Sequence, residues 1–196
     1  MSRSTRPFTV HPSRLVVVGA VIVSTVLAAR APTRLAAQSA GAGDAGDPAD
    51  ARPEDVSTLD AIIRAYYEVV SGPAGEAPDR RRDRSLHHPD ALVAIAGTDA
   101  AGVPTLRTMT LDGYHDLFGG PRAAGFYEVE IHREVQRFGN VVHVWSTYAS
   151  STEPDGEPFA RGINSIQLFY DGDRWWITSW VFDGTPGLRV PARYLP

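Results

Sequence analysis

The sequence predicts one α+β domain in which helices come first and an antiparallel sheet follows. In the first half of the folded part, apolar residues recur at three- and four-residue steps, as they do in amphipathic helices. The last third consists of long alternating segments separated by hairpin sequences. Helices and strands in separate blocks are typical of a curved sheet with helices packed on one face. The 196 residues, 43 % of them hydrophobic, are enough for one core of ordinary size.

The N-terminal segment has the pattern of a secretory signal. Residues 1–14 contain three arginines and no acid, and residues 15–29 form an uncharged, mainly apolar run. This run is shorter than the roughly 20 residues that cross a bilayer, and small residues at 35–37 offer a cleavage site. We therefore interpret residues 1–37 as a signal peptide and expect a secreted or periplasmic protein. Because Arg30 and Arg34 lie between the run and this site, an uncleaved membrane anchor is the alternative.

Residues 38–53 contain no large apolar side chain, so they cannot bury enough surface to offset the entropy of ordering. We interpret them as a flexible linker that precedes a folded domain of residues 54–196.

Removal of the first 37 residues leaves 14 arginines against 23 acidic residues. A chain with this charge is repelled by phosphates, so we expect no nucleic-acid partner.

The composition excludes several kinds of site. Cysteine is absent, which excludes disulfides, cysteine-ligated metals and thiol nucleophiles. All 19 basic residues are arginine, which excludes a Schiff-base lysine and a phosphate-binding lysine. The sequence has no HExxH motif, no GxSxG motif and no glycine-rich phosphate loop. We therefore expect neither a metal nor a cofactor.

Three helices are predicted before the long strands. The first begins at Glu54 and ends before Gly72, with one apolar stripe made of Val56, Leu59, Ile62, Ile63, Tyr66 and Val70. A second covers residues 79–87 and is stopped by Pro89. A third begins at a cap on Thr110 or Asp112 and runs through Leu117.

Six strands are predicted. Residues 91–96 and 104–109 suit a strand pair around a turn. Residues 126–138, 141–151, 159–170 and 175–183 form an antiparallel meander, since Asn-, Asp- and Gly-rich turns separate them.

The turns also predict which side chains share a face. A two-residue loop at 139–140 sets His132 opposite Thr147. Turns centred on residues 155–156 and on Gly172 set Thr147 opposite Asn164, and Asn164 opposite Val181. Neighbouring rows on this face contain Trp145, Ile166, Ser179 and Asp183. This assignment assumes strands without bulges, because one bulge exchanges the two faces.

The order of elements resembles the NTF2-like superfamily, in particular its SnoaL-like and DUF4440-like branches. The resemblance covers residues 54–183. It is carried by Tyr66-Tyr67, by the segment 86–90 (LHHPD) and by the closing strand 171–177 (DGDRWWI). It implies a cone in which the helices and the sheet enclose a cavity, lined from the side of Trp175, Ile177, Ser179 and Val181. The superfamily includes enzymes, carriers and oligomerisation modules, so the resemblance leaves function open.

We expect the cavity to bind a small, mostly apolar organic molecule, with contacts from Tyr66, Trp145, Thr147, Ile166, Ser179 and Val181. The alternative is a cofactor-free acid–base enzyme of the isomerase, dehydratase or cyclase type. In it, His132 is the general base, Asn164 polarises a carbonyl group, and Asp183 orients a second group. Each of these residues also has a structural interpretation: His132 on a solvated edge strand, Asn164 in a structural hydrogen bond, and the aromatic residues in core packing.

The opposite sheet face is nearly apolar and contains Val129, Ile131, Val144, Tyr148, Ile163, Phe169, Trp176, Trp180 and Phe182. We expect a second subunit to cover it, which makes the protein a homodimer and leaves a homo-oligomerisation module as a third functional hypothesis.

We interpret four histidines as surface or capping residues: His87, His88, His115 and His143. Leu188, Tyr194 and Leu195 are expected to close over an edge of the domain.

Overall fold

The computed structural model describes residues 51–196. The predicted signal peptide and most of the predicted linker lie outside these residues. The helices are α1 (Pro53–Val56), α2 (Leu59–Val70), α3 (Arg80–Leu86) and α4 (Leu111–Phe118), with a short 3-10 helix, η2 (Ala192–Tyr194), near the C-terminus. The strands are β1 (His87–Thr98), β2 (Pro104–Thr110), β3 (Tyr127–Phe138), β4 (Val141–Ser151), β5 (Ala160–Tyr170) and β6 (Trp175–Asp183).

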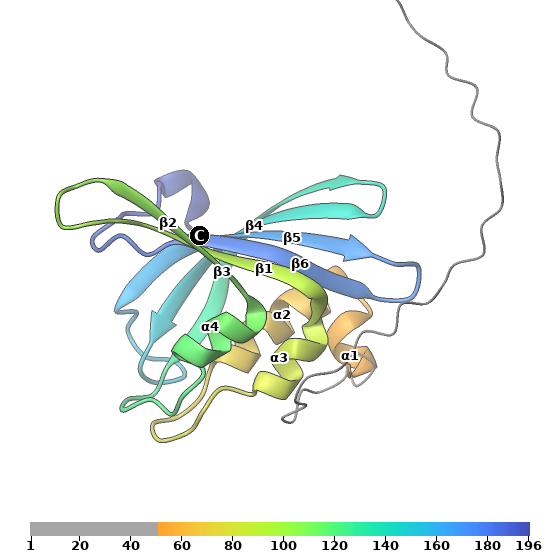
Figure 1. Cartoon of the computed structure of the whole chain (residues 1–196), viewed down its shortest axis with the longest axis horizontal. Helices are drawn as coiled ribbons and strands as arrows, with labels where there is room; N and C mark the ends of the chain where they lie inside the picture. Colours follow the sequence, from red (N-terminus) through yellow and green to blue (C-terminus); the bar gives the residue numbers. More distant parts are fainter. Residues whose placement is uncertain (1–50) are drawn as a thin grey trace, which may run out of the picture. The chain divides into compact units, whose positions relative to one another are not determined.

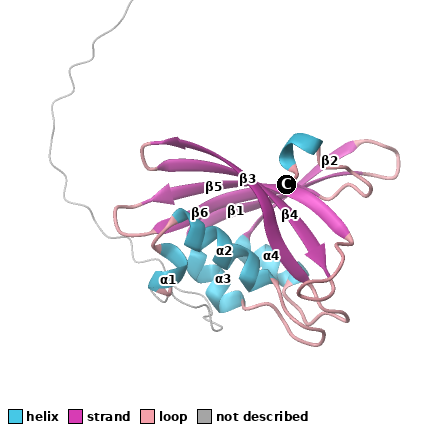
Figure 2. Ribbon diagram, turned by 180° about the vertical axis from the view of Figure 1, so that it is seen from behind, coloured by secondary structure: helices cyan, strands magenta, loops and turns pink. Residues whose placement is uncertain are grey.

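The six strands form one sheet in the order β2-β1-β6-β5-β4-β3. All neighbouring pairs are antiparallel except β1 and β6, which are parallel. Figures 1 and 2 show α1 to α4 together on one face of this curved sheet, while the C-terminal segment lies on the other face. The predicted α+β class and the antiparallel meander are confirmed. No helix within residues 51–196 is both long and apolar enough to span a bilayer.

Local capping explains where the helices begin. The predicted first helix is divided at residues 57–58, because the Thr58 side chain accepts a hydrogen bond from the backbone N–H of Ala61 and so caps α2. Asp79 caps α3 and Thr110 caps α4 in the same way. The core lies between α2 and the sheet, where Ile62, Ile63, Val144, Ile166, Leu168 and Ile177 are almost completely buried.

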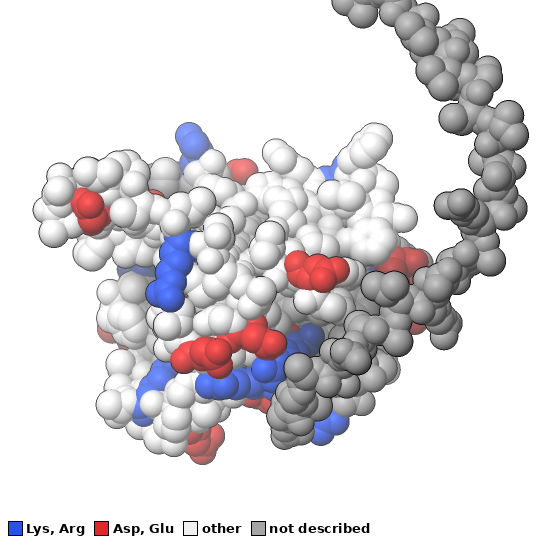
Figure 3. Space-filling model, in the orientation of Figure 1, with Lys and Arg blue, Asp and Glu red and all other residues white. Residues whose placement is uncertain are grey.

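A group of ion pairs fixes the helices to one another. The Arg82 guanidinium donates to both carboxylate oxygens of Asp55, over 2.8 and 2.7 Å, and to Glu68 over 2.6 Å. It therefore joins α3 to α1 and α2. On the surface, Arg84 pairs with Asp112 of α4. Figure 3 shows acidic and basic side chains next to one another over this helical layer.

A bulge in β3 changes which side chains face the helices. The pairing of β3 with β4 follows the predicted register from the turn as far as His132, which lies opposite Thr147. The register then shifts by one residue, and Glu130 pairs with Tyr148. A bulge moves the residues beyond it to the opposite face. Glu128 and Glu130 therefore face the helices, whereas His132 faces away from them.

The observed pairing of Asn164 also differs from the predicted register by one residue. Asn164 pairs with Ser146 rather than with Thr147, because β4 and β5 are joined by a loop of residues 152–159 and not by a tight turn that fixes register. Between β5 and β6 a second bulge shifts the pairing, so that Asn164 lies opposite Phe182 rather than Val181. Asn164 consequently faces the helices, and Thr147 and Val181 face the other way.

Candidate functional site

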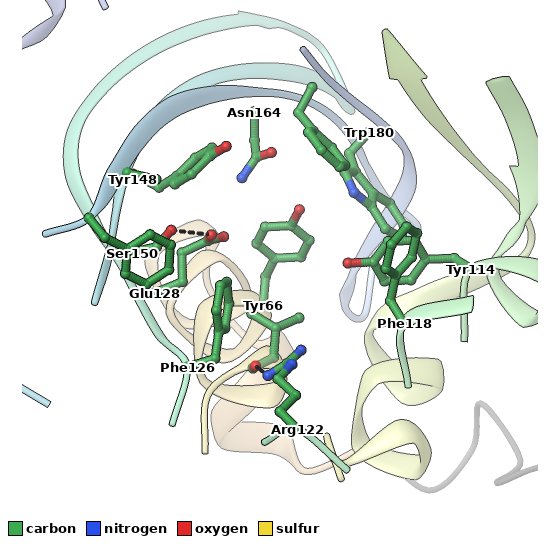
Figure 4. Close-up of a pocket in the computed structure, with 14 residues that line it drawn as sticks. Tyr66, Tyr114, Phe118, Arg122, Phe126, Glu128, Tyr148, Ser150, Asn164 and Trp180 are labelled. Atoms are coloured by element: carbon green, nitrogen blue, oxygen red, sulfur yellow. Dashed lines mark hydrogen bonds between the residues drawn. The ribbon is translucent and has the colours of Figure 1, made fainter. Parts of the chain in front are cut away.

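A cavity of about 320 Å³ lies between the helices and the concave face of the sheet. We call it the helix-side cavity. Its walls are mainly aromatic, and Figure 4 shows these rings around a central space. They belong to Tyr66, Tyr114, Phe118, Phe126, Tyr148, Phe159, Trp180 and Phe182. The volume is at the lower end of the range for small-molecule sites, so it suits a molecule of one or two rings.

A few polar groups converge on this aromatic space. Glu128 of β3 accepts a hydrogen bond from the Ser150 hydroxyl of β4 over 2.9 Å (Figure 4). Arg122 donates to the Val70 carbonyl oxygen over 2.6 Å, and its guanidinium lies 4.5 Å from the centroid of the Phe126 ring. A mostly apolar cavity with a few positioned polar groups is the usual composition of a ligand site.

Glu128 is the titratable group best suited to chemistry in this cavity. Burial among the aromatic rings raises its pKa to about 7, because a charged carboxylate is poorly solvated there. The Ser150 hydrogen bond and the positive charge of Arg122 act in the opposite direction and lower the pKa. Near neutral pH both the acid and the carboxylate are therefore populated, so this side chain can either donate or accept a proton.

The tyrosines around the cavity remain protonated. Burial raises the pKa of Tyr148 to about 12, and it also raises the pKa values of Tyr66 and Tyr114. Each is therefore an O–H donor at neutral pH. The Tyr66 hydroxyl makes no hydrogen bond within residues 51–196, and Figure 4 shows it pointing across the cavity toward Asn164.

Asn164 has a structural partner as well as a place in the cavity wall. Its Nδ2 donates to the Tyr67 hydroxyl over 3.3 Å, and this hydroxyl lies 2.6 Å from the Ser146 Oγ. Ser146 in turn donates to Glu130. This network joins β5, β4 and β3 to α2 and holds the Asn164 amide in one orientation at the cavity.

Tyr148 reaches the cavity because the residue opposite it is glycine. A Cβ on Gly162 would lie 2.3 Å from the Tyr148 hydroxyl oxygen and 2.5 Å from Cζ. We expect Gly162→Ala to displace this ring and to destabilise the fold by about 1–3 kcal/mol, the usual cost of overpacking. Urea denaturation measures the change. Gly97→Ala, whose Cβ would lie 3.5 Å from the Thr105 Oγ1, is the matched strand control and should change stability little.

Helices on one face of a curved sheet, with a cavity enclosed between the two layers, match the architecture that the resemblance implied. The architecture of residues 51–196 is therefore the one expected from the resemblance to the NTF2-like superfamily. No protein-family model matches the sequence, and no curated protein is similar to it.

Several solved structures are similar to this domain at low identity. One is an NTF2-like protein of unknown function from Silicibacter pomeroyi, with 12 % identity over 64 % of this chain and 92 % of that one, and a TM-score of 0.43. Another is a beta subunit assigned to an aromatic-ring-hydroxylating dioxygenase of Novosphingobium aromaticivorans, with 15 % identity over 71 % and 94 % and a TM-score of 0.47. A third is a domain from Xanthomonas campestris, assigned as a calcium/calmodulin-dependent protein kinase II association domain, with 14 % identity over 72 % and 93 % and a TM-score of 0.46. Likeness at this level concerns the fold and not the function.

The structure does not bring the three predicted catalytic residues together. Asn164 faces the helix-side cavity, whereas His132 and Asp183 lie on the opposite sheet face. The predicted grouping is wrong because the two bulges and the long β4–β5 loop each change the register by one residue. An active site made of these three residues is therefore geometrically excluded.

The predicted ligand contacts are divided in the same way. Tyr66 lines the helix-side cavity, and Ile166 is completely buried in the core beside it. Trp145, Thr147, Ser179 and Val181 face away from the helices, although Trp175 and Ile177 of the same strand as Ser179 face the core as expected. The side chains of β6 change from one sheet face to the other at the bulged residue Thr178, between Ile177 and Ser179.

The apolar face predicted for a second subunit is also largely internal. Val144, Tyr148, Trp180 and Phe182 pack in or against the core beneath the helices, since the register shifts place them there. The subunit contact proposed from these residues is therefore not available at that surface. Phe169 and Val129 remain exposed.

Two histidines interpreted as surface residues are buried. His115 Nε2 lies 2.7 Å from the Asp83 Oδ2, and His87 Nδ1 lies 2.7 Å from the Asp83 carbonyl oxygen. The His87 ring packs 4.8 Å from the Trp180 ring, because the chain is already in β1 at this residue and turns the imidazole inward. Within residues 51–196 no three His, Cys, Asp or Glu side chains are arranged to hold a metal ion.

Sequence reasoning missed Glu128, the most informative residue of the cavity. It belongs to the alternating acids Glu128, Glu130 and Glu134 of β3, which a strand without a bulge would place on the same face as His132. The acidic residues at alternate positions of the strand indicated that one sheet face carries carboxyl groups. The bulge between Glu130 and His132 decides which of them face the helices.

Proposed function

We propose that this domain binds a small, mostly apolar organic molecule with an oxygen-bearing polar group in the helix-side cavity. The observation that carries the proposal is the aromatic lining around Glu128, whose pKa is about 7, and around the Tyr66 hydroxyl, which has no hydrogen-bond partner within the described residues. The rings supply apolar contact, whereas Glu128, Tyr66 and Asn164 supply hydrogen bonds that orient the ligand.

The polar side chains define the chemistry of the preferred ligand. The Tyr66 hydroxyl is a donor that lacks a partner within the described residues, so an acceptor oxygen on the ligand would satisfy it. Glu128 accepts from a ligand hydroxyl when ionised and donates when protonated. Phenols and ketones with one or two rings meet both conditions.

Equilibrium dialysis with 2-naphthol tests this proposal. We expect wild-type protein to bind it, and Ala160→Trp to weaken binding by about tenfold or more, because Ala160 lines the cavity and an indole there fills it. Ala101→Trp, at an exposed turn between β1 and β2, is the matched control and should bind like wild type. Thermal unfolding of both variants verifies that they are folded. Equal binding by wild type and Ala160→Trp would exclude this cavity as the site.

A second function, acid–base catalysis without a cofactor, is favoured by the Glu128 pKa of about 7. The carboxylate would remove a proton next to a ligand carbonyl group, and a tyrosine hydroxyl or the Asn164 amide would stabilise the oxygen that gains charge. The proposed catalytic residues are therefore Glu128, Tyr66 and Asn164. They replace the set predicted from the sequence, in which His132 and Asp183 accompanied Asn164.

Export and assembly into a homodimer are further parts of this proposal. Export is supported by the arginine-flanked apolar run of residues 15–29. Assembly is supported by an exposed apolar row across the sheet, in which Phe138 pairs with Val141, and Val141 with Phe169. These side chains are 89 %, 56 % and 37 % exposed, and a second copy would remove them from water.

A further inference from the structure

A second cavity lies on the sheet face that is turned away from the helices. It measures about 680 Å³, and we call it the outer cavity. Its floor is formed by Trp145, Ile163 and Val181 of β4 to β6. Its roof is the C-terminal segment, residues 184–196, which contributes Leu188, Val190 and Pro191.

The roof is attached to the domain at its two ends. At the start, the Gly184 N–H donates to the Ala96 carbonyl oxygen over 2.9 Å. At the end, the Tyr194 ring packs against His132 and Trp145, with centroids 6.5 and 6.1 Å apart. The apolar residues between these attachments therefore form one wall of a partly open cavity instead of packing directly on the sheet.

The charged residues at the outer cavity are mainly positive. Arg161, Arg189 and Arg193 line it, against the single acid Asp183. Asp183 already accepts a hydrogen bond from the Thr185 backbone N–H over 2.8 Å. Arg193 is bonded to the Tyr194 hydroxyl, whereas Arg161 and Arg189 make no hydrogen bond or ion pair within residues 51–196. Two guanidinium groups are thus free to bind an anion.

Unsatisfied polar atoms lie on the same face beside this cavity. Thr147 Oγ1, His132 Nε2 and Trp145 Nε1 are buried without a hydrogen-bond partner, and Thr147 is completely buried. A buried polar atom without a partner costs free energy. The outer cavity itself combines an apolar floor with lining arginines, which suits a molecule with both apolar and polar parts.

We propose that the outer cavity binds an amphipathic organic anion, with its apolar body between the C-terminal segment and the sheet, and its anionic group at Arg161 and Arg189. A guanidinium binds a carboxylate or a related oxyanion through charge-assisted, paired hydrogen bonds. Trp145, Ile163 and Val181 remove the hydrocarbon part from water. This site is separate from the helix-side cavity and does not depend on the function proposed there.

Isothermal titration calorimetry with decanoate tests the proposal. We expect wild-type protein to bind decanoate, and decan-1-ol to bind about tenfold more weakly, because it lacks the charge. The double variant Arg161→Gln/Arg189→Gln should lose about tenfold in decanoate affinity and retain 2-naphthol binding. Arg107→Gln, an exposed arginine of β2 that lines neither cavity, is the matched control and should bind decanoate like wild type.

Three results would overturn the proposal. They are equal decanoate affinity of wild type and the double arginine variant, equal affinity for decanoate and decan-1-ol, or loss of decanoate binding in Ala160→Trp. The last result would place decanoate in the helix-side cavity. Failure of 2-naphthol to bind, with decanoate binding intact and arginine-dependent, would contradict the proposed function alone.

Discussion

Replacement of Glu128 by glutamine is expected to slow proton exchange at an activated C–H bond by about a hundredfold or more. Glutamine keeps the shape of the side chain and can still accept the Ser150 hydrogen bond, but it cannot take up a proton. General-base assistance contributes about a hundred- to ten-thousandfold in rate, so its loss is large. The measurement is the incorporation of deuterium into 2-tetralone in D2O, followed by NMR.

The pH profile distinguishes Glu128 from a merely structural residue. Because the pKa of Glu128 is raised to about 7, the carboxylate that removes the proton accumulates as the pH rises through 7. The exchange rate of the wild type should therefore increase up to this pH and then level off. Glu134→Gln is the matched control, since Glu134 lies beyond the bulge on the opposite face of the same strand. Equal exchange rates in wild type and Glu128→Gln would leave binding as the only function of this cavity.

Arg82→Met should lower the free energy of unfolding by about 3–5 kcal/mol, the largest loss of stability expected from the ion pairs of the domain. The substitution removes both hydrogen bonds to Asp55, whose side chain is only 2 % exposed. An unpaired carboxylate then stays buried between the helices. Chemical denaturation at pH 7 measures the loss. Arg84→Met, which breaks a pair with the largely exposed Asp112, should cost no more than about 1 kcal/mol.

The pH dependence of this effect has a definite sign. The hydrogen bond from Arg82 holds the pKa of Asp55 below its usual range. The stability that it supplies is therefore present above the unfolded pKa of about 4, and it is lost as the pH falls through the lower folded value. The difference between wild type and Arg82→Met should shrink in acid. The double variant Asp55→Asn/Arg82→Met should recover part of the loss at pH 7, and no recovery would contradict the assigned role of Asp55.

Repeating local patterns were sufficient to predict the elements. The apolar stripe of α2, the cap at Thr110 and the hairpin sequences around Gly139 and Gly172 act within a few residues, so their effects can be derived from the sequence. The bounds of β4 and β6 agree with the prediction for this reason. The predicted pair of His132 and Thr147 is likewise confirmed, because a two-residue turn fixes the register next to it.

The site could not be predicted to the same degree. Strand alternation has a period of two, so one inserted residue transfers every later side chain to the other face. The bulges beside Ile131 and at Thr178 have no distinctive residue types, since neither position is glycine or proline. They place Glu128 in the helix-side cavity and leave His132 outside it. His87 and His115 were misassigned for a related reason, because their burial depends on contacts with Asp83 and Trp180.

Short-range periodicity and turn chemistry specify the α+β class, the order of the elements and the NTF2-like resemblance, so all three could be derived from the residues alone. The three-dimensional packing was needed to show which carboxyl group lies in the aromatic cavity and that the C-terminal segment covers part of a second cavity on the opposite face. Both depend on strand register and on contacts between residues far apart in the chain, and the free energies of such contacts are not encoded in any local pattern.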